Sequence, residues 1–227
     1  AAYSGARAMV TMKQVGLNVA ADPLMSLAYV GVKGGMVIVS ADDPGPISSQ
    51  TEQDTRRFAD FCRIPVFDPS SPEEAYKMIG EAFEYSEKYN TPVLFRPTTR
   101  VCHAYASIDN CDSPSPKKYE GFVKDSKKWV IFPRLSFANH IMIEKRNVEI
   151  GKDFSTYSAN KAEGVNSEKA VVTSGISYAY TKECLKDYTD VKLIKIATAY
   201  PFPEDFVLSS LEGCLLYTSP SPRDAHE

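Results

Sequence analysis

The sequence predicts an α/β fold in which a parallel sheet carries helices on both of its faces. Continuous apolar segments at residues 36–41 (MVIVSA) and 92–96 (PVLFR) are typical of strands that are buried on both faces. Between them, residues 72–89 carry apolar side chains at helical spacing and follow a capping box formed by Ser71 and Glu74. Strands and helices that alternate with short connections indicate a parallel sheet.

The other elements of the first half follow the same alternation. Residues 6–11 (ARAMVT) form a short apolar segment and predict a strand. We expect Asn18 to cap a helix over residues 20–32, because Asn favours the position before a first helical turn. Further along the chain we expect a polar loop at residues 42–54, a short helix near 56–62 and a strand at 64–67.

The second half begins with a segment that breaks this alternation. Residues 112–166 contain Pro114, Pro116 and many lysines, and we interpret them as an inter-domain arm with some helix near residues 137–148. This division leaves a first domain at residues 1–111 and the start of a second α/β domain at residues 167–213. In the second domain we expect strands at 169–173 and 191–197 and helices at 176–188 and 203–211.

Composition excludes several classes of protein and of site. The chain has 227 residues, a net charge of −3 and 43% hydrophobic residues, so no basic footprint for nucleic acid is present. No apolar segment approaches the roughly 20 residues of a membrane helix. The five cysteines include no CxxC pair, which favours a reduced cytoplasm and gives no zinc or iron–sulfur pattern. His103 and His140 have no suitably spaced partner, so we expect no metal ligands within this chain.

The segment after the first predicted strand offers candidate ligand contacts. It opens a helix at the edge where open α/β sheets bind ligands. Gly16 permits a close approach of the backbone, and Lys13 is either a ligand contact or a solvated surface charge. Asn18 is either a cap alone or a cap that also faces a ligand.

Two more polar segments follow predicted strands and reach the same edge. The loop at residues 42–54 holds Ser48, Ser49, Gln50 and Glu52. It either lines a site or forms a turn that leads into a helix cap at Asp54 or Thr55. Arg100 can hold a substrate carboxylate, although the segment that contains it can also be a simple exit loop.

Long segments of this chain closely resemble a known enzyme family. These segments are GARAMVTMKQVGLNVAADPL, GGMVIVSADDPGPISSQTEQDTRRFA and TPVLFRPTTRVCH, followed in the same order by KKWVIFP and VVTSGISYAYTKECL. They resemble the alpha subunit of indolepyruvate ferredoxin oxidoreductase, a member of the thiamine diphosphate-dependent 2-oxoacid:ferredoxin oxidoreductases. The resemblance extends over residues 1–213.

The resemblance implies a fold, an activity and a set of cofactors. Enzymes of this family decarboxylate aryl pyruvates oxidatively to aryl-acetyl-CoA, and they pass the electrons to ferredoxin. By this resemblance, residues 1–111 are most of a pyrimidine-binding domain and residues 167–213 begin a transketolase C-terminal-like domain. The whole enzyme is expected to use thiamine diphosphate with Mg²⁺, 4Fe–4S clusters and coenzyme A, and to pair with a beta subunit.

The resemblance also suggests roles for the candidate residues. Lys13, Gly16 and Asn18 are expected on the cofactor side, whereas Ser48, Ser49, Gln50, Glu52 and Arg100 are expected to border the aryl 2-oxoacid. The activating Glu of the family is expected upstream of this chain, so the catalytic residue is unknown here and Glu52 is not its substitute. Ile47 stands where family members typically have His before SSQ.

Other interpretations remain open at this stage. One is a different 2-oxoacid:ferredoxin oxidoreductase or a thiamine diphosphate-dependent decarboxylase, and another is a non-catalytic α/β binding module. The C-terminal segment CLLYTSPSPRD resembles one reading frame of a DNA-library adapter. We therefore expect residues 214–227 to be a non-native tail and the chain to be a fragment that binds the cofactor weakly or not at all.

Overall fold

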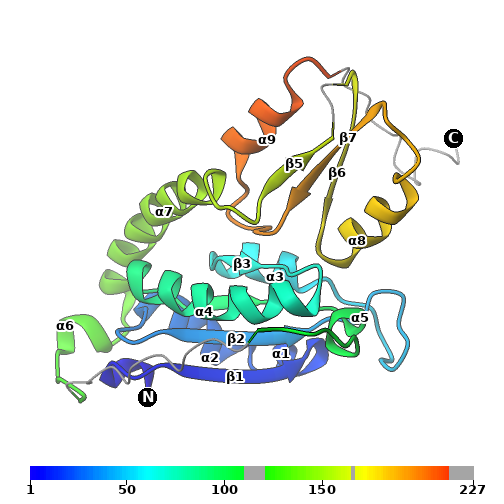
Figure 1. Cartoon of the computed structure of the whole chain (residues 1–227). Coiled ribbons are helices and arrows are strands. Elements are labelled where there is room, and N and C mark those ends of the chain that lie inside the picture. The colour runs from blue at the N-terminus through cyan, green and yellow to red at the C-terminus, as the bar shows by residue number, and fades with distance from the viewer. Residues whose placement is uncertain (110–120, 165–166, 215–227) are drawn as a thin grey trace, which may run out of the picture.

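The computed structural model describes residues 1–109, 121–164 and 167–214. The expected non-native tail therefore lies outside the described residues except for Cys214, and so does Cys111. Figure 1 shows two units, one above the other, joined along one side by a long helix. The predicted α/β class with a parallel sheet is confirmed.

The first unit contains a four-stranded parallel sheet. Its strands are β1 (Ala8–Lys13), β2 (Met36–Ala41), β3 (Val66–Phe67) and β4 (Val93–Phe95), and they lie in the order β1-β2-β4-β3. The register pairs Met12 with Ser40 and places Ile38 beside Leu94. Because all four strands run in one direction, the segments that follow them meet at one edge of the sheet, which we call the carboxyl edge.

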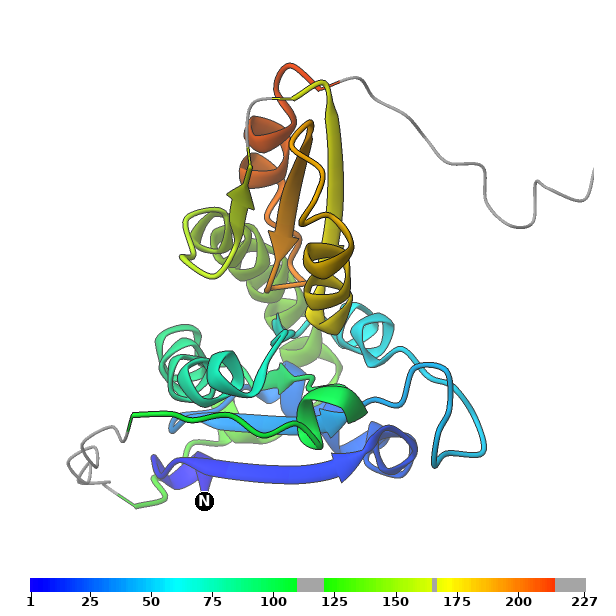
Figure 2. The ribbon, with the colours of Figure 1, turned by 45° about the vertical axis from the view of Figure 1, so that its right-hand side comes forward.

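Helices cover both faces of this sheet (Figures 1 and 2). One face packs on α1 (Gln14–Val19), α2 (Ala21–Val30) and α3 (Thr55–Cys62), through a buried cluster that includes Leu17, Ile38 and Leu94. The other face packs on α4 (Pro72–Tyr89), through a second cluster that includes Phe67 and Met78. The apolar strand segments are therefore buried from both sides, as their composition predicts.

The predicted capping box of α4 is only partly formed. The Ser71 hydroxyl accepts a hydrogen bond from the Glu74 amide at 3.2 Å, and Pro72 occupies the first turn. The Glu74 carboxylate, however, accepts from the amide and the hydroxyl of Ser70, both at 2.7 Å. The carboxylate therefore fixes the residue before the cap, and the start of α4 still receives two side-chain contacts.

The prediction that Asn18 caps a helix over residues 20–32 is wrong. Asn18 lies inside α1 with an exposed side chain, and α2 begins after Ala20, which offers no capping side chain. The chain turns from α1 into α2 because the Ala20 and Leu24 amides donate to the carbonyls of Gly16 and Ala20, respectively, both at 3.0 Å. Asn18 thus has no local structural task of the kind that its residue type suggested.

The segment interpreted as an arm is dominated by one long helix. Helix α7 (Pro133–Ser155) starts earlier and ends later than the expected residues 137–148. Its buried residues Ile150 and Phe154 join the second core cluster. The long helix is therefore part of the hydrophobic core, because its apolar residues pack beside α4. The short helices η1 (Ala2–Ser4), α5 (Thr99–Cys102) and α6 (Ser126–Trp129) complete this part of the molecule.

The second unit is a smaller sheet with two helices. Its strands are β5 (Lys161–Glu163), β6 (Lys169–Ser174) and β7 (Val191–Ile196), and they lie in the order β5-β7-β6. Strand β5 is antiparallel to β7, and β6 is parallel to it. A segment of this unit continues the first sheet, since the Val66 amide donates to the Tyr200 carbonyl at 2.7 Å. The two units therefore share backbone hydrogen bonds. The two helices of this unit are α8 (Gly175–Cys184) and α9 (Glu204–Leu211).

Candidate functional site

Polar residues from three strands meet at the carboxyl edge of the first sheet. Lys13 ends β1, Asp42 and Asp43 follow β2 directly, and Thr99 follows β4. The Thr99 amide donates to the Asp42 carbonyl at 2.8 Å, which closes the edge between β2 and β4. This is the edge at which open α/β sheets bind ligands.

The Asp43 carboxylate organises the polar loop, which comprises residues 44–54. Its Oδ2 accepts from the amides of Ile47, Ser48 and Ser49 at 3.1, 2.9 and 3.0 Å, and from the Ser49 hydroxyl at 2.9 Å. Its Oδ1 accepts from the Thr99 hydroxyl at 2.9 Å. The hydrogen bonds from Ser48, Ser49, Thr99 and Ile47 hold the pKa of Asp43 well below its usual range. The loop is thus folded around a carboxylate that stays ionised.

Lys13 and Gln14 tie the same loop to the end of β1. The Lys13 ammonium donates to the carbonyl and the hydroxyl of Ser48 at 2.9 and 3.3 Å. The Gln14 amide donates to the Ser49 hydroxyl at 2.8 Å and to the Thr51 carbonyl at 3.3 Å. Gln14 is fully buried, and its Oε1 accepts no hydrogen bond in the described structure. The edge therefore contains a buried acceptor that still lacks a donor.

A buried ion network lies beneath the loop. The Arg96 guanidinium donates from Nε to Asp42 at 2.6 Å and from Nη1 to Asp68 at 3.3 Å. Asp42 also accepts from the amide and the hydroxyl of Thr55, at 3.0 and 2.8 Å, which fixes the start of α3. Burial raises the pKa of Asp68, and the positive charges of Arg96 and Arg56 oppose that shift. These contacts hold the ends of β2, β3 and β4 in one arrangement.

The network also reaches the second unit. The Arg56 guanidinium donates to the Ser174 hydroxyl at 2.7 Å and lies 3.6 Å from the Asp68 carboxylate. A Cβ at Gly175, whose φ is +52°, would lie 2.5 Å from Asp68, so only glycine fits beside that carboxylate. The carboxyl edge of the first unit and the start of α8 therefore form one continuous structure.

The structure brings together only some of the residues selected from the sequence. Lys13, Ser48 and Ser49 share the contacts described above. Gly16 lies in α1, where an added Cβ would lie 3.1 Å from the Met12 side chain, so close packing accounts for this glycine. The remaining candidates have exposed side chains that make no hydrogen bond in the described part of the chain, and they are Asn18, Gln50, Glu52 and Arg100.

Sequence reasoning missed the residues that hold the site together. Gln14 was not selected, although it follows a predicted strand immediately. Arg96 ends an apolar segment, and a charge at that position is a recognisable signal, because such a charge is buried only with a partner. Asp68 carried no comparable signal, since its partners Arg56 and Arg96 are distant in the sequence.

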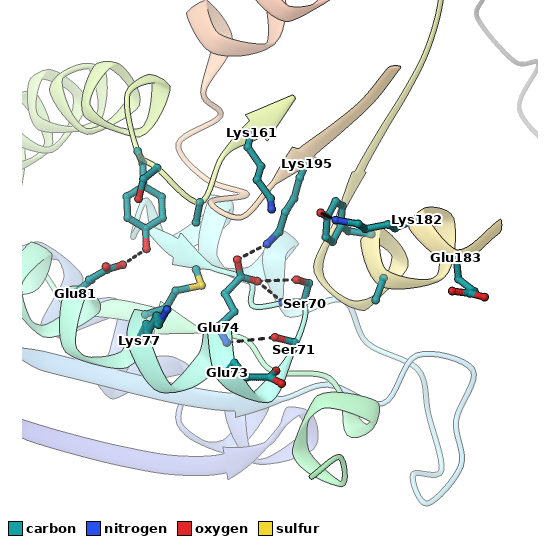
Figure 3. A pocket seen from close by; sticks show the side chains of 16 residues that line it. Ser70, Ser71, Glu73, Glu74, Lys77, Glu81, Lys161, Lys182, Glu183 and Lys195 are labelled. Carbon is teal, nitrogen blue, oxygen red and sulfur yellow. Dashed lines mark hydrogen bonds and ion pairs between the residues drawn. The ribbon is translucent and has the colours of Figure 1, made fainter. Parts of the chain in front are cut away.

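A separate cavity of ≈ 650 Å³ opens between the two units (Figure 3). Glu74, on α4, forms an ion pair with Lys195, on β7. Glu163 pairs with Lys161 at 2.6 Å and with Lys182 at 2.8 Å. Within the described residues these three lysines are therefore matched by carboxylates of the chain itself.

The hydropathy of the helices and the placement of possible metal ligands bear on the class of site. None of the helices in residues 1–109, 121–164 and 167–214 combines the length and the hydropathy that a membrane crossing requires. In the same ranges, no group of three or more His, Cys, Asp or Glu side chains is placed to hold a metal ion.

Comparisons with known proteins show similarity to one group of oxidoreductase subunits. The chain is 42% identical to indolepyruvate oxidoreductase subunit IorA of Thermococcus kodakarensis over 221 residues, which is 94% of this chain and 34% of that protein. The subunits of the same name from Pyrococcus horikoshii and Methanothermobacter marburgensis are 40% and 37% identical, over 89% and 95% of this chain. Each of these matches pairs nearly the whole chain with a segment of a longer IorA subunit. The resemblance stated from the sequence is thereby confirmed.

The match has a limited extent. The chain spans about a third of the length of the IorA subunits that it matches, 33% of the Pyrococcus horikoshii protein and 36% of the Methanothermobacter marburgensis protein. No family model matches the chain.

A solved structure supports the fold. The chain is similar to the 2-oxoglutarate:ferredoxin oxidoreductase from Magnetococcus marinus, with a TM-score of 0.66 and 17% sequence identity. The similarity covers 94% of this chain and 45% of that one. That structure was solved with 2-oxoglutarate, coenzyme A and succinyl-CoA bound. At this level of identity the comparison shows a shared fold.

Proposed function

We propose that this chain forms part of the alpha subunit of an indolepyruvate:ferredoxin oxidoreductase. The proposed reaction is the oxidative decarboxylation of an aryl 2-oxoacid to the aryl-acetyl-CoA thioester, with transfer of the electrons to ferredoxin. The observation that carries the proposal is the identity of 36–42% with six IorA subunits, over at least 89% of the chain. The polar carboxyl edge gives that relationship a physical location for ligand binding.

The carboxyl edge has the donors and acceptors that the pyrimidine half of thiamine diphosphate needs. The buried Gln14 Oε1 lacks a donor, and an aminopyrimidine carries N–H groups that can supply one. Lys13 and the loop around Asp43 present further polar groups at the same edge. When bound, thiamine diphosphate supplies the carbanion-stabilising chemistry of the reaction.

The chain's own residues would contribute binding and orientation. Asp43 fixes the amides of residues 47–49, so the Ser48 and Ser49 hydroxyls are held in place at the loop. Lys13, Gly16 and Asn18 stay assigned to the cofactor side of this edge. Gln50 and Glu52 stay assigned to the substrate side, and the exposed Arg100 is the candidate partner of the substrate carboxylate.

The remaining components belong to the whole enzyme that we propose. They are the Mg²⁺ ion of the diphosphate, the 4Fe–4S clusters, coenzyme A, the beta subunit and ferredoxin. The IorA relatives are about three times as long as the matched segment, which leaves room for such sites elsewhere in the subunit. A cytoplasmic location is part of the same proposal.

A chimeric enzyme tests the proposal. The matched third of Thermococcus kodakarensis IorA is replaced by residues 1–213 of the present chain, and the subunit is co-expressed with its beta subunit. We expect the purified chimera to contain thiamine diphosphate and to reduce ferredoxin when indolepyruvate and coenzyme A are present. The matched control is the same chimera with the Lys13→Ala substitution, which we expect to bind less cofactor while it stays folded.

Two results would contradict the proposal. One is an assembled chimera that contains the cofactor but turns over no aryl 2-oxoacid. The other is a chimera that prefers 2-oxoglutarate or pyruvate to indolepyruvate, which would identify a different 2-oxoacid:ferredoxin oxidoreductase.

A further inference from the structure

A second cavity, of ≈ 620 Å³, lies at the opposite edge of the first sheet. The ends of α2 and α4 line it, and these helices end where β2 and β4 are about to begin. Helices α6 and α7 close the other side. This volume lies in the range of pockets that hold small molecules. We call it the basic cavity, and its charged lining residues are Lys88, Lys127, Lys128, Arg146 and Glu149.

The positive charge of the basic cavity is only partly compensated. Lys88 forms an ion pair with Asp153, and Glu149 is the one carboxylate among the lining residues described. Lys127 and Lys128 are exposed and form no ion pair in the described structure, although the Lys128 ammonium lies 4.5 Å from the centre of the Trp129 ring. Lining cations therefore outnumber lining anions.

Among these cations, Arg146 gives the strongest indication of an anion site. Its Nε–H is buried and has no acceptor in the described structure, and its Nη2 donates to the Arg63 carbonyl at 3.5 Å. Within the described residues no carboxylate lies close enough to form an ion pair with it. Burial lowers the pKa of Arg146 to about 10. Arg146 as a whole is half-buried, and a half-buried guanidinium without a carboxylate is suited to an anion that the chain does not supply.

Helix dipoles do not account for this arrangement. The ends of α2 and α4 attract cations, and Lys88 in the last turn of α4 is explained in that way. Lys127 and Lys128 also lie in a last turn, that of the short helix α6. Arg146 lies in the interior of α7, so its position has another cause. The cavity between the units shows the alternative outcome, because Lys161, Lys182 and Lys195 there are all paired with carboxylates. Figure 3 shows the pair of Lys195 with Glu74.

We propose that the basic cavity binds a small phosphate-bearing anion. Phosphate oxygens accept bidentate hydrogen bonds from a guanidinium and attract lysine ammonium groups. Arg146 supplies the guanidinium, and Lys127 and Lys128 supply the mobile charges at the mouth. The site uses residues that the proposed function at the carboxyl edge does not use.

The test is calorimetric titration of the full chain with inorganic pyrophosphate at constant ionic strength. We expect saturable binding at one site and a dissociation constant at least about tenfold weaker in the double variant Lys127→Gln/Lys128→Gln. Lys145→Gln is the control, because Lys145 is exposed on α7, next to Arg146, and lines no part of the cavity. The control should bind pyrophosphate as tightly as the parent chain.

A second variant separates a ligand contact from a structural role. Arg146→Met removes a half-buried charge that has no carboxylate partner, so we expect it to lose pyrophosphate binding without lowering the melting temperature. The proposal is overturned if the parent chain shows no saturable binding or if the double variant binds as the parent does. Equal weakening by Lys145→Gln would show unspecific attraction, and a lower melting temperature for Arg146→Met would show a structural arginine; either result also overturns it.

Discussion

An arginine lies at each of the two edges of the first sheet, and the two differ in burial and in partners. Arg96 is buried, whereas Arg146 is half-buried. At the carboxyl edge, Arg96 is paired with Asp42 at 2.6 Å and with Asp68 at 3.3 Å. At the opposite edge, Arg146 has a weak contact to a carbonyl and a buried Nε without an acceptor. The chain therefore supplies carboxylates for the buried guanidinium of Arg96 and none for the half-buried guanidinium of Arg146.

This difference separates residues that hold the fold together, which we call the framework, from residues that are available to bind a ligand. Where the chain supplies the counter-ions, the charges fix the ends of strands and a loop, and the free polar groups stand on that framework. Where it does not, a charge is held at a cost that an external anion can relieve. The predictions below probe this contrast, beginning with the largest expected effect.

The first prediction concerns Arg96. Arg96→Met leaves Asp42 and Asp68 buried without their cation, so we expect a loss of about 3–5 kcal/mol in the free energy of unfolding. Urea denaturation of the full chain measures it. Arg100→Ala is the control, because Arg100 is exposed and should change stability by less than about 0.5 kcal/mol. Similar effects at both positions would refute the framework role of Arg96.

The second prediction concerns the ion pair between the units. Glu74→Gln keeps the contacts to Ser70 but leaves Lys195, whose side chain is 3% exposed, without a carboxylate. We expect a loss of roughly 3 kcal/mol, which is the low end of the cost of breaking a buried pair. The measurement is again urea denaturation, with Glu73→Gln as a control at the neighbouring exposed position. An unchanged stability would mean that the pairing in this cavity is incidental.

The third prediction concerns Asp43 and pH. Its folded pKa is depressed, so its contribution to stability is complete above the unfolded value of about 3.9 and is lost as the pH falls through the folded value. Asp43→Asn should therefore lower the melting temperature at neutral pH, and the gap to the parent chain should narrow below pH of about 4. Hydrogen exchange at the amides of residues 47–49 should speed up in the variant. A gap that is independent of pH would contradict this account.

The smallest effect is expected at Ile47. Its amide binds Asp43 at 3.1 Å while its side chain is 59% exposed, so Ile47→His should change stability by less than about 0.5 kcal/mol. In the chimeric enzyme, the same substitution should change the KM for indolepyruvate, because it restores the residue type that family members typically have. A large stability change with unchanged KM would place residue 47 in the framework.

The sequence predicted the fold well where the signal was local. Apolar strands, the α4 cap and the short connections determine the parallel sheet, and each of them is readable within a few residues. The prediction that Asn18 caps a helix was wrong, because the preference of Asn for cap positions is weak beside the backbone hydrogen bonds of the turn that joins α1 to α2. Helix α7 extends past the expected residue 148, and its last turns contribute Ile150 and Phe154 to the second core cluster, which is a tertiary contact that a local pattern does not show.

The site was harder to predict than the fold. Residues 48 and 49 were selected because they are polar and follow a strand. The groups that hold them, Gln14 and Asp43, act across the loop and β1, and their partners are known only from the folded chain. Residues that pair although they are far apart in the sequence, such as Arg96 and Asp68, produce no periodic pattern in the sequence.

Cofactor titration of the chimera tests the contrast between the edges most directly. Calorimetry with thiamine diphosphate and Mg²⁺ is performed on the parent chimera, on Asp43→Asn and on the double variant Lys127→Gln/Lys128→Gln. We predict that Asp43→Asn weakens cofactor binding by about tenfold or more and that the double variant binds as the parent does. Weaker binding in the double variant with unchanged binding in Asp43→Asn would contradict the assignment of the cofactor to the carboxyl edge.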